Sequence, residues 1–201
     1  MANKSYWDNF YLKDSAPHEE SSFARFCYEF INNGGSTSPT KLLDVACGNG
    51  RDTFYFLRKG FNASGVDLSA LPDAAGINFY SGDILCWDYN SCDVLYLRFI
   101  VHSLTENELD VLLGRIASTV RRGVRVFIET RSSRGITDQE KSETFFKSGV
   151  GEEHFRMLYS SDYLRAKLAR VFDVIYESEA NGVSVYKGED PYCLRFVLLS
   201  K

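Results

Sequence analysis

Short, mostly apolar segments are spread along the chain, separated by longer segments with a different pattern. Nearly continuous apolar runs of this length are typical of strands that are buried on both faces of a parallel sheet. The longer segments carry apolar residues three and four positions apart, which is the spacing of an amphipathic helix. Strands are expected at residues 41–46, 62–67, 77–80, 94–97 and 124–130, and helices at residues 21–31, 51–59, 105–120 and 163–171.

The helix ends have signals of their own. Thr105 and Glu108 match a capping box, in which each side chain bonds the backbone N–H group of the other residue. Ser21 or Ser22 can cap the first helix, and Gly123 stands where the third is expected to end. Strands that alternate with helices predict an α/β protein with a doubly wound, mainly parallel sheet, covered on both faces and connected by right-handed crossovers.

The C-terminal part of the chain breaks this alternation. Residues 172–178, 183–187 and 192–200 are expected to be β-rich, with a turn at Asn181-Gly182. Strands joined by so short a connection must be antiparallel. Residues 131–147 are polar and have no period, so we expect a mobile loop or lid there.

Residues 42–52, which read Leu-Leu-Asp-Val-Ala-Cys-Gly-Asn-Gly-Arg-Asp, join an expected strand to a helix. Gly48 and Gly50 lack a Cβ atom, so the backbone can turn sharply there and lie directly against a ligand. The helix that follows points its free N–H groups toward the same place. Asp67 ends the next strand, where a carboxylate can accept two hydrogen bonds from a ribose diol. Strand, glycine turn, helix, strand and acid in this order predict a nucleotide site.

Each part of this pattern also has an ordinary structural explanation. The glycines could form a simple tight turn, Asp67 could cap a helix over residues 68–75, and Asp44 could be a solvated acid. A nucleotide site explains the order and the spacing of all these residues at once. Three separate structural explanations would each have to apply, so we favour the nucleotide site. A dinucleotide site would carry a third glycine where this chain has Thr53, which weakens the dehydrogenase alternative.

The composition limits the class of protein. The 201 residues are 44% hydrophobic and 25% charged, which suits one soluble globular domain and would be cramped for two. The formal charge of −4 argues against a general nucleic-acid binder. No apolar run approaches the roughly 20 residues that cross a bilayer, and residues 1–10 hold no signal-peptide core. Five scattered cysteines without a Cys-x-x-Cys pair suit free thiols in a cytoplasmic protein better than disulfides or zinc.

With these segments in place, the chain resembles the class I S-adenosylmethionine-dependent methyltransferases over almost its whole length. The best-matched segments are residues 43–52, Gly65-Val66-Asp67-Leu68-Ser69, Gly82-Asp83-Ile84 and residues 97–104. Within the family, Gly-Asn-Gly-Arg-Asp is similar to the tellurite-resistance and thiopurine branch of small-molecule enzymes. Tyr6-Trp7, Ser22-Phe23-Ala24, His154-Phe155-Arg156 and Glu189-Asp190-Pro191 resemble small bacterial enzymes associated with surface-glycan or phosphoryl-group methylation.

The resemblance implies a Rossmann-like, seven-stranded, mainly parallel sheet with an antiparallel C-terminal strand. It implies one domain over residues 1–201, with an N-terminal helical cap of residues 1–40 and a core of residues 41–201. It also implies S-adenosylmethionine as the cofactor, bound by Asp44, Ala46, Gly48, Gly50, Asp52, Asp67, Leu68, Asp83, Ile84, Arg98 and Phe99. Ala46 departs from the family's Gly-x-Gly-x-Gly pattern, so a weaker or slightly shifted fit of the cofactor is expected.

The acceptor side carries two alternative sets of residues. A sulfonium already holds an activated methyl group, so catalysis is mostly positioning and exclusion of water. For a neutral hydroxyl, thiol or amine, His102 is the expected general base, unless it is a histidine hydrogen-bonded in a helix-loop corner. Glu129 is a second candidate, but it could equally pair with Arg131 or Arg98. For a phosphate or carboxylate no base is needed, and a cation cluster can align the acid: Arg98, Arg131, Arg134 and Arg156.

The aromatic residues near the start of the chain also have two interpretations. Trp7 and Tyr11, with Tyr6 and Phe23, either close over the ligands and contact the acceptor or form an aromatic patch under the first helix. We expect methyl transfer to an oxygen of a small acidic or phosphorylated acceptor, with a neutral acceptor as the second hypothesis. A cofactor-binding protein without turnover and a dehydrogenase are the remaining alternatives. No nucleic-acid, membrane or metal partner is expected, and the oligomeric state stays open.

Overall fold

A seven-stranded sheet forms the centre of the computed structural model, which describes residues 4–12, 17–32, 40–69, 78–136, 145–147 and 153–201. Its strands are β1 (Lys41–Val45), β2 (Asn62–Asp67), β3 (Phe79–Ser81), β4 (Val94–Arg98), β5 (Arg125–Arg131), β8 (Phe172–Ala180) and β9 (Cys193–Ser200). They lie in the order β3-β2-β1-β4-β5-β9-β8. The first five are parallel, and β9 is inserted antiparallel between β5 and β8. The predicted sheet with a reversed C-terminal strand is therefore confirmed.

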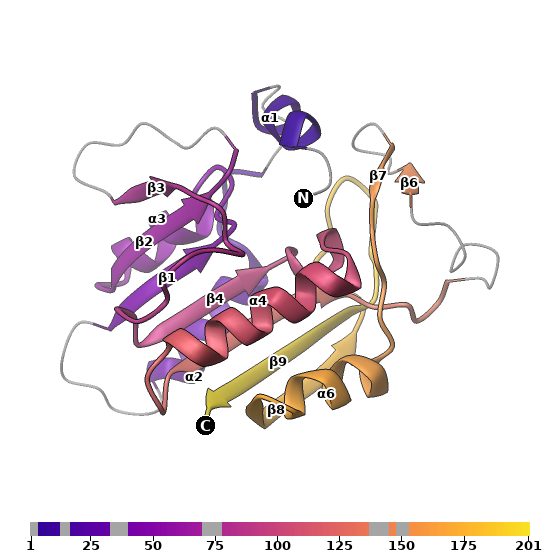
Figure 1. Cartoon of the computed structure of the whole chain (residues 1–201). Helices are drawn as coiled ribbons and strands as arrows, with labels where there is room; N and C mark the ends of the chain where they lie inside the picture. The colour runs from indigo at the N-terminus through magenta and orange to yellow at the C-terminus, as the bar shows by residue number, and fades with distance from the viewer. Residues whose placement is uncertain (1–3, 13–16, 33–39, 70–77, 137–144, 148–152) are drawn as a thin grey trace.

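Helices cover both faces of this sheet (Figure 1). The helices of the described residues are α1 (Lys4–Leu12), α2 (Ser22–Asn32), α3 (Arg51–Arg58), the short 3-10 helix η1 (Val101–Ser103), α4 (Glu106–Thr119) and α6 (Ser161–Ala169). The predicted capping box at the start of α4 is present, since Thr105 and Glu108 bond each other's backbone N–H groups. In Figure 1, α1 lies above the edge of the sheet toward which β1 and β4 point. None of the helices in the described part of the chain is long and apolar enough to span a membrane.

Alternating strand residues explain why the sheet needs cover on both faces. In β1, Leu43 and Val45 belong to the core cluster that contains the buried leucines of α4 and α6, whereas Leu42 packs with the buried aromatic residues of α2 and α3. The same alternation continues in β4, where Leu95 and Leu97 face α4 and Tyr96 faces α2. Each such side chain contributes about 1.5–3 kcal/mol by leaving water. These two cores hold the strand ends, and therefore the site, in a fixed arrangement.

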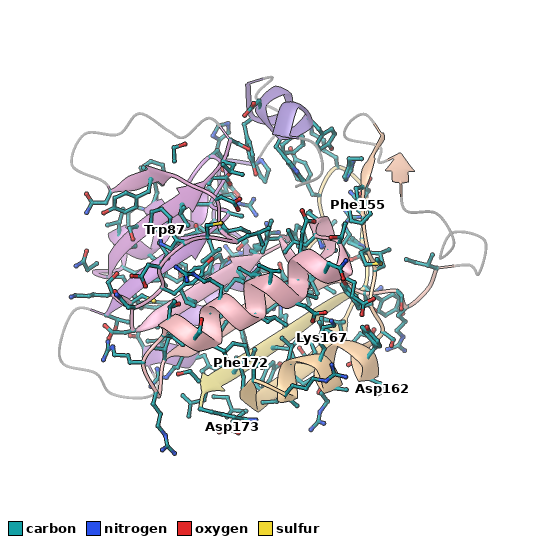
Figure 2. The ribbon with its side chains drawn as sticks, in the orientation of Figure 1. Trp87, Phe155, Asp162, Lys167, Phe172 and Asp173 are labelled. Carbon is teal, nitrogen blue, oxygen red and sulfur yellow. The ribbon has the colours of Figure 1, made fainter. Side chains whose placement is uncertain are left out.

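The contact between α4 and α6 includes one buried cation. Lys167 is 6% exposed and lies between the two helices (Figure 2), where it pairs with Glu106 at 3.5 Å and with Asp110. The long lysine stem covers apolar surface while its ammonium group reaches these two carboxylates. Both helices lie on the front face of the sheet (Figure 1).

Two expectations about individual segments were wrong. Residues 183–187 form no strand; the chain turns there and makes one isolated bridge between Tyr186 and Glu189. The segment 131–147 is not loop throughout, because Arg131 completes β5 and residues 145–147 form β6 (Phe145–Lys147), paired with β7 (Glu153–Phe155). The strand expected at 77–80 is β3, shifted by one to two residues. Residues 137–144, and most of the helix considered at 68–75, lie outside the described residues.

Candidate functional site

The turn after β1 has the backbone conformation that its glycines suggested. Gly48 and Gly50 have φ angles of 55° and 72°, and Gly50 directly precedes α3. Ala46 also lies in the left-handed region, with φ of 62°. A residue with a Cβ atom loses about 1–2 kcal/mol in this conformation, so the family position usually held by glycine is under backbone strain in this chain. The Ala46 N–H group donates to the carbonyl of Val66 at 2.8 Å, which ties the turn to β2.

Asp67 closes this turn from the neighbouring strand. Its carboxylate, in a side chain that is 8% exposed, accepts the N–H groups of Gly48 at 2.8 Å and of Ser69 at 2.7 Å. A carboxylate offers about four acceptor positions, so two remain for further donors such as the hydroxyls of a diol. The turn and the acid that were predicted to share a ligand therefore lie in direct contact.

Two more acids lie buried beneath the turn. Asp44 accepts a hydrogen bond from the Thr53 hydroxyl at 2.7 Å, and burial, together with the nearby Asp52 charge, raises the pKa of Asp44 to about 8. Asp52 accepts from the Ser21 N–H group at 2.8 Å and from the Tyr96 hydroxyl at 2.6 Å. Thr53, which replaces the third glycine of a dinucleotide motif, is thus a partner of the buried acid Asp44.

Helix α1 places its aromatic residues over the turn. A Cβ atom added at Gly48 would overlap the Tyr11 phenol, so the Tyr11 ring lies against the bare backbone of the turn. Burial raises the pKa of Tyr11 above its usual value, and the Asp67 charge adds to this effect. Trp7 stacks with Tyr11 at a centroid distance of 6.2 Å, and Tyr6 stacks on His154 at 4.4 Å. Tyr11, expected on the acceptor side, therefore lies at the glycine turn, and Tyr6 joins α1 to β7.

A row of three charged residues crosses the sheet beside the turn. Arg98, Glu129 and Arg195 are register neighbours on β4, β5 and β9. Glu129 is fully buried and accepts from the Nε atoms of Arg98 at 2.9 Å and of Arg195 at 2.7 Å. Glu129 does not line the cavity described below. Both of its oxygens hold guanidinium groups in place, so we assign Glu129 the role of positioning Arg98 and Arg195 and not that of a general base.

Arg98 and Phe99 lie where β4 ends. The Phe99 backbone has φ of 60°, a conformation that is uncommon for a bulky residue and is found mainly where the surrounding structure enforces it. Its ring lies 4.1 Å from the Arg98 guanidinium carbon and 5.2 Å from the His102 ring. Both residues line the cavity, as expected.

Four cationic or imidazole side chains gather on the other side of Phe99: His102 from η1, Arg131 from the end of β5, His154 from β7, and Arg156 just after it. Arg131 pairs with Glu189 at 2.7 Å. The Arg156 Nε atom instead donates to the His154 Nε2 atom at 2.9 Å. Burial, with the nearby Arg131 charge, lowers the pKa of Arg156 to about 10. Arg156 is therefore charged at neutral pH and held by an uncharged partner.

One cavity of about 650 Å³ joins these parts, a volume that suits a ligand of nucleotide size or larger. We call one part the glycine-turn half, lined by Ala46, Cys47, Arg51, Asp67, Leu68 and Ile84, and the other the basic half, lined by His102, Arg131, His154, Arg156 and Glu189. Asp44, Asp52, Arg98, Phe99, Trp7 and Tyr11 also contribute to the lining. The described residues contain no group of three or more side chains that could hold a metal ion.

Besides Glu129, four predicted residues lie outside the lining. Arg134 is 57% exposed, pairs with Glu179 at 3.4 Å and stacks on Tyr192, so it does not belong to the cation cluster. Asp83 accepts the Leu85 N–H group at 2.9 Å and leaves Ile84 alone to face the cavity. Gly48 and Gly50 are also absent from the lining, and the Tyr11 ring covers Gly48.

Arg51 and His154 are among the lining residues for which no function was predicted. Arg51 begins α3 and lies 3.6 Å from Asp52, and burial, together with Arg98, lowers its pKa. Its position directly after Gly50 was a usable signal. His154 had no such signal, because its contact with Tyr6 joins segments that are far apart along the chain.

No protein-family model matches the sequence, and no curated protein sequence matches it. Solved structures do match the fold. 1,6-Didemethyltoxoflavin-N1-methyltransferase from Burkholderia thailandensis, solved with S-adenosylhomocysteine, is 21% identical, with a TM-score of 0.67 over 90% of this chain and 80% of that one. The chain has the class I methyltransferase fold. The N-methyltransferase NodS from Bradyrhizobium japonicum is 13% identical, with a TM-score of 0.62 over 98% of this chain and 99% of that methyltransferase.

Proposed function

We propose that the protein transfers a methyl group from S-adenosylmethionine to a small molecule that carries an acidic group. The observation that supports this most directly is the single cavity in which Asp67 and the glycine turn face the same space as Arg131 and Arg156. A nucleoside-binding end and an anion-binding end in one enclosed space suit a transfer reaction between two ligands. Solved proteins of the same fold contain S-adenosylhomocysteine or S-adenosylmethionine.

The glycine-turn half fits the cofactor on its own chemistry. Asp67 keeps two acceptor positions for the ribose hydroxyls, and Leu68 and Ile84 supply apolar surface for the adenine. Arg51 and Arg98 are cations within reach of the methionine carboxylate end. The cofactor supplies a methyl group on a positively charged sulfur. The protein's part is to orient the two ligands, with α1 excluding water above them.

The basic half favours an acidic acceptor. Two arginines, Arg131 and Arg156, share this half with one carboxylate, Glu189, so among the described lining residues positive charge exceeds negative charge there. An anion that enters this half replaces lost hydration with charge-assisted hydrogen bonds. The resemblance to enzymes of surface-glycan and phosphoryl-group methylation agrees with such an acceptor. We place the reaction in the cytoplasm, where the free thiols of the chain are stable.

A nitrogen acceptor is the second candidate. Three of the solved proteins with this fold are named N-methyltransferases or N1-methyltransferases. Tyr6 and Trp7, which line the cavity beside His154, offer aromatic faces for a flat nitrogen compound. The two candidates differ in what they require of the arginines, because a neutral amine gains nothing from Arg156.

The decisive assay uses purified protein, S-adenosylmethionine labelled in the methyl group, and fractions of a metabolite extract. We expect label in an anionic fraction. With the acceptor from that fraction, Arg131→Ala and Arg156→Ala should each lower kcat/KM by about 10- to 100-fold, since a hydrogen bond to a charged group contributes about 1.5–3 kcal/mol. Arg134→Ala is the matched control, because Arg134 lies outside the cavity.

Three outcomes would contradict the proposal. Binding of S-adenosylhomocysteine without transfer to any fraction would indicate a protein that senses the cofactor. Transfer to a neutral amine that is insensitive to Arg156→Ala would support the nitrogen acceptor instead. If Arg134→Ala lowered kcat/KM as much as Arg156→Ala, the assigned acceptor side would be wrong.

A further inference from the structure

The hydrogen bonds of His102 fix the position of its proton. Its Nδ1 atom accepts the backbone N–H group of Arg131 at 3.2 Å and lies 3.0 Å from the Thr130 hydroxyl. A backbone N–H group can only donate, so Nδ1 carries no proton. The proton of the neutral ring is therefore on Nε2, the atom for which the described residues provide no hydrogen-bond acceptor. His102 lines the cavity, so this N–H group is available to a ligand.

The surroundings also keep the His102 ring uncharged. The side chain is 3% exposed, and burial lowers its pKa well below 6.5. The charged and titratable groups that face it act in the same direction, and they come from three elements and one segment: Arg156 after β7, Arg131 on β5, His154 on β7 and Arg98 on β4. A second proton on Nδ1 would also face the Arg131 N–H group.

A general base must offer a lone pair to the proton that it removes. The only lone pair of neutral His102 is on Nδ1, where it is already used inside the protein. We therefore infer that His102 acts as a hydrogen-bond donor to an acceptor that is itself an oxyanion, a carboxylate or a phosphate, and that this oxyanion is the atom methylated. This inference rests on the proposed function and replaces the expected base with a donor.

Arg156 supplies the charge that such an acceptor requires. Its Nε atom donates to the His154 Nε2 atom, and no ion pair joins its two terminal nitrogens to a described carboxylate, although the Glu189 charge acts on the group. Arg131 differs, because Glu189 already occupies one of its terminal nitrogens at 2.7 Å. Glu189 is the carboxylate that lines the basic half, and this ion pair keeps it engaged.

The reaction that follows needs no proton transfer. A lone pair of the acceptor oxygen forms a bond to the methyl carbon while the carbon–sulfur bond breaks and its electrons return to sulfur. One negative and one positive charge are consumed, and the products are a neutral thioether and a methyl ester. The work left to the protein is to align the oxyanion, through the Nε2–H group of His102 and the guanidinium of Arg156, and to keep water out.

The first test observes the proton directly and does not depend on turnover. In protein labelled with ¹⁵N at its three histidines, His102→Gln assigns the His102 signals. We expect the Nε2–H form, with no titration between about pH 8 and about pH 5.5, because the pKa is far below the ordinary value of about 6.5. A proton on Nδ1, or a titration near pH 6.5, would overturn the inference even if methyl transfer is confirmed.

The second test examines the product of the labelled assay. A carboxyl methyl ester releases volatile labelled methanol in mild alkali, and a phosphate methyl ester keeps the label on a phosphorus-containing product that resists phosphatase. Either result supports an oxyanion acceptor and tells the two sources apart. Label in an alkali-stable product without phosphorus would overturn the inference while leaving methyl transfer established. No transfer at all, with S-adenosylhomocysteine bound, would refute the proposed function and the inference with it.

A pair of substitutions separates a donor from a base. Gln at position 102 keeps an N–H donor but is no base, so His102→Gln should lower kcat/KM by about tenfold, the value of one neutral hydrogen bond. His102→Leu, which has no donor, should lower it further. The loss of a general base would instead cost about 10²- to 10⁴-fold in both variants and remove a limb of the pH profile. If His102→Gln fails to fold, the product analysis still decides; in the wild type kcat/KM should stay level from neutral pH until Arg156 loses its proton near pH 10.

Discussion

In the glycine-turn half of the cavity, the polar groups come from one stretch of chain and largely satisfy one another. Asp67 accepts two backbone N–H groups, and Asp44 accepts the Thr53 hydroxyl. In the basic half, Arg131 comes from β5, whereas His154 and Arg156 come from β7 and the residue after it. Glu189 pairs with Arg131, and among the described residues the Arg156 guanidinium hydrogen-bonds only His154. The first half is organised around acids and the second around two arginines that share one carboxylate.

The difference indicates that the glycine-turn half binds the cofactor and that the basic half determines which acceptor is used. A turn whose N–H groups and carboxylates are preorganised binds one constant ligand and loses little on binding. The cations of the basic half lie on β5 and just after β7, away from the glycine turn. Each of them can therefore be substituted without disturbing the turn. We therefore expect substitutions in the two halves to separate cleanly, one affecting the cofactor and the other the acceptor.

Asp67→Ala should give the largest effect and is the strongest test of this separation. Loss of two charge-assisted hydrogen bonds to the ribose should weaken S-adenosylhomocysteine binding by about 100-fold or more, measured by calorimetry. Arg156→Ala should leave that affinity within about threefold. Asp83→Ala is the control acid, because Asp83 lies outside the cavity lining. If Arg156→Ala weakened cofactor binding as much as Asp67→Ala, the two halves would not be independent.

The glycine-turn half was also the part that the sequence pattern could predict. The turn, Asp67 and the order of the strands depend on local signals: short apolar runs, two glycines and a terminal acid. Because the ends of neighbouring parallel strands meet at one edge of the sheet, local signals of this kind are enough to place the site. The tellurite-resistance or glycan branch, by contrast, stays a prediction.

The basic half depends on contacts that local patterns do not encode. Arg131 and Arg134 are three residues apart, but β5 ends at Arg131 and the chain then turns, so one lines the cavity and the other lies on the surface. The position of Glu129 at a strand end suggested a general base. The sequence did not show that Arg195 on β9, 66 residues further along, would lie beside it and bind its carboxylate. Tyr11 was assigned to the acceptor because nothing in the sequence shows that α1 folds back onto Gly48.

Asp44→Asn tests the acidic character of the glycine-turn half. The pKa of Asp44 rises from 3.8 to about 8 on folding, so between these values the folded protein binds more protons than the unfolded chain. Stability is then lost as pH rises through this window. Asn keeps an acceptor for Thr53 without the charge, so this variant should lose less stability than the wild type between about pH 5.5 and about pH 8 in thermal unfolding. Asp173→Asn, an exposed acid, is the control; an identical pH dependence in Asp44→Asn and wild type would show that Asp44 is ionised in the folded protein.

The smallest expected effect compares backbone strain next to the two halves. Ala46 and Phe99 both have φ near 60°, where glycine is preferred. Ala46→Gly should raise the free energy of unfolding by about 0.5–1 kcal/mol, and the melting temperature by about 2 °C. The reason is that relief of the backbone strain outweighs the conformational entropy that a glycine adds to the unfolded chain. Phe99→Gly relieves the same strain but removes the ring that lies 4.1 Å from the Arg98 guanidinium carbon, so no gain in stability is expected and kcat/KM should fall. If Phe99→Gly were as stabilising as Ala46→Gly and fully active, the Phe99 ring would have no part in ordering Arg98 and His102, and the strain beside the basic half would have no function.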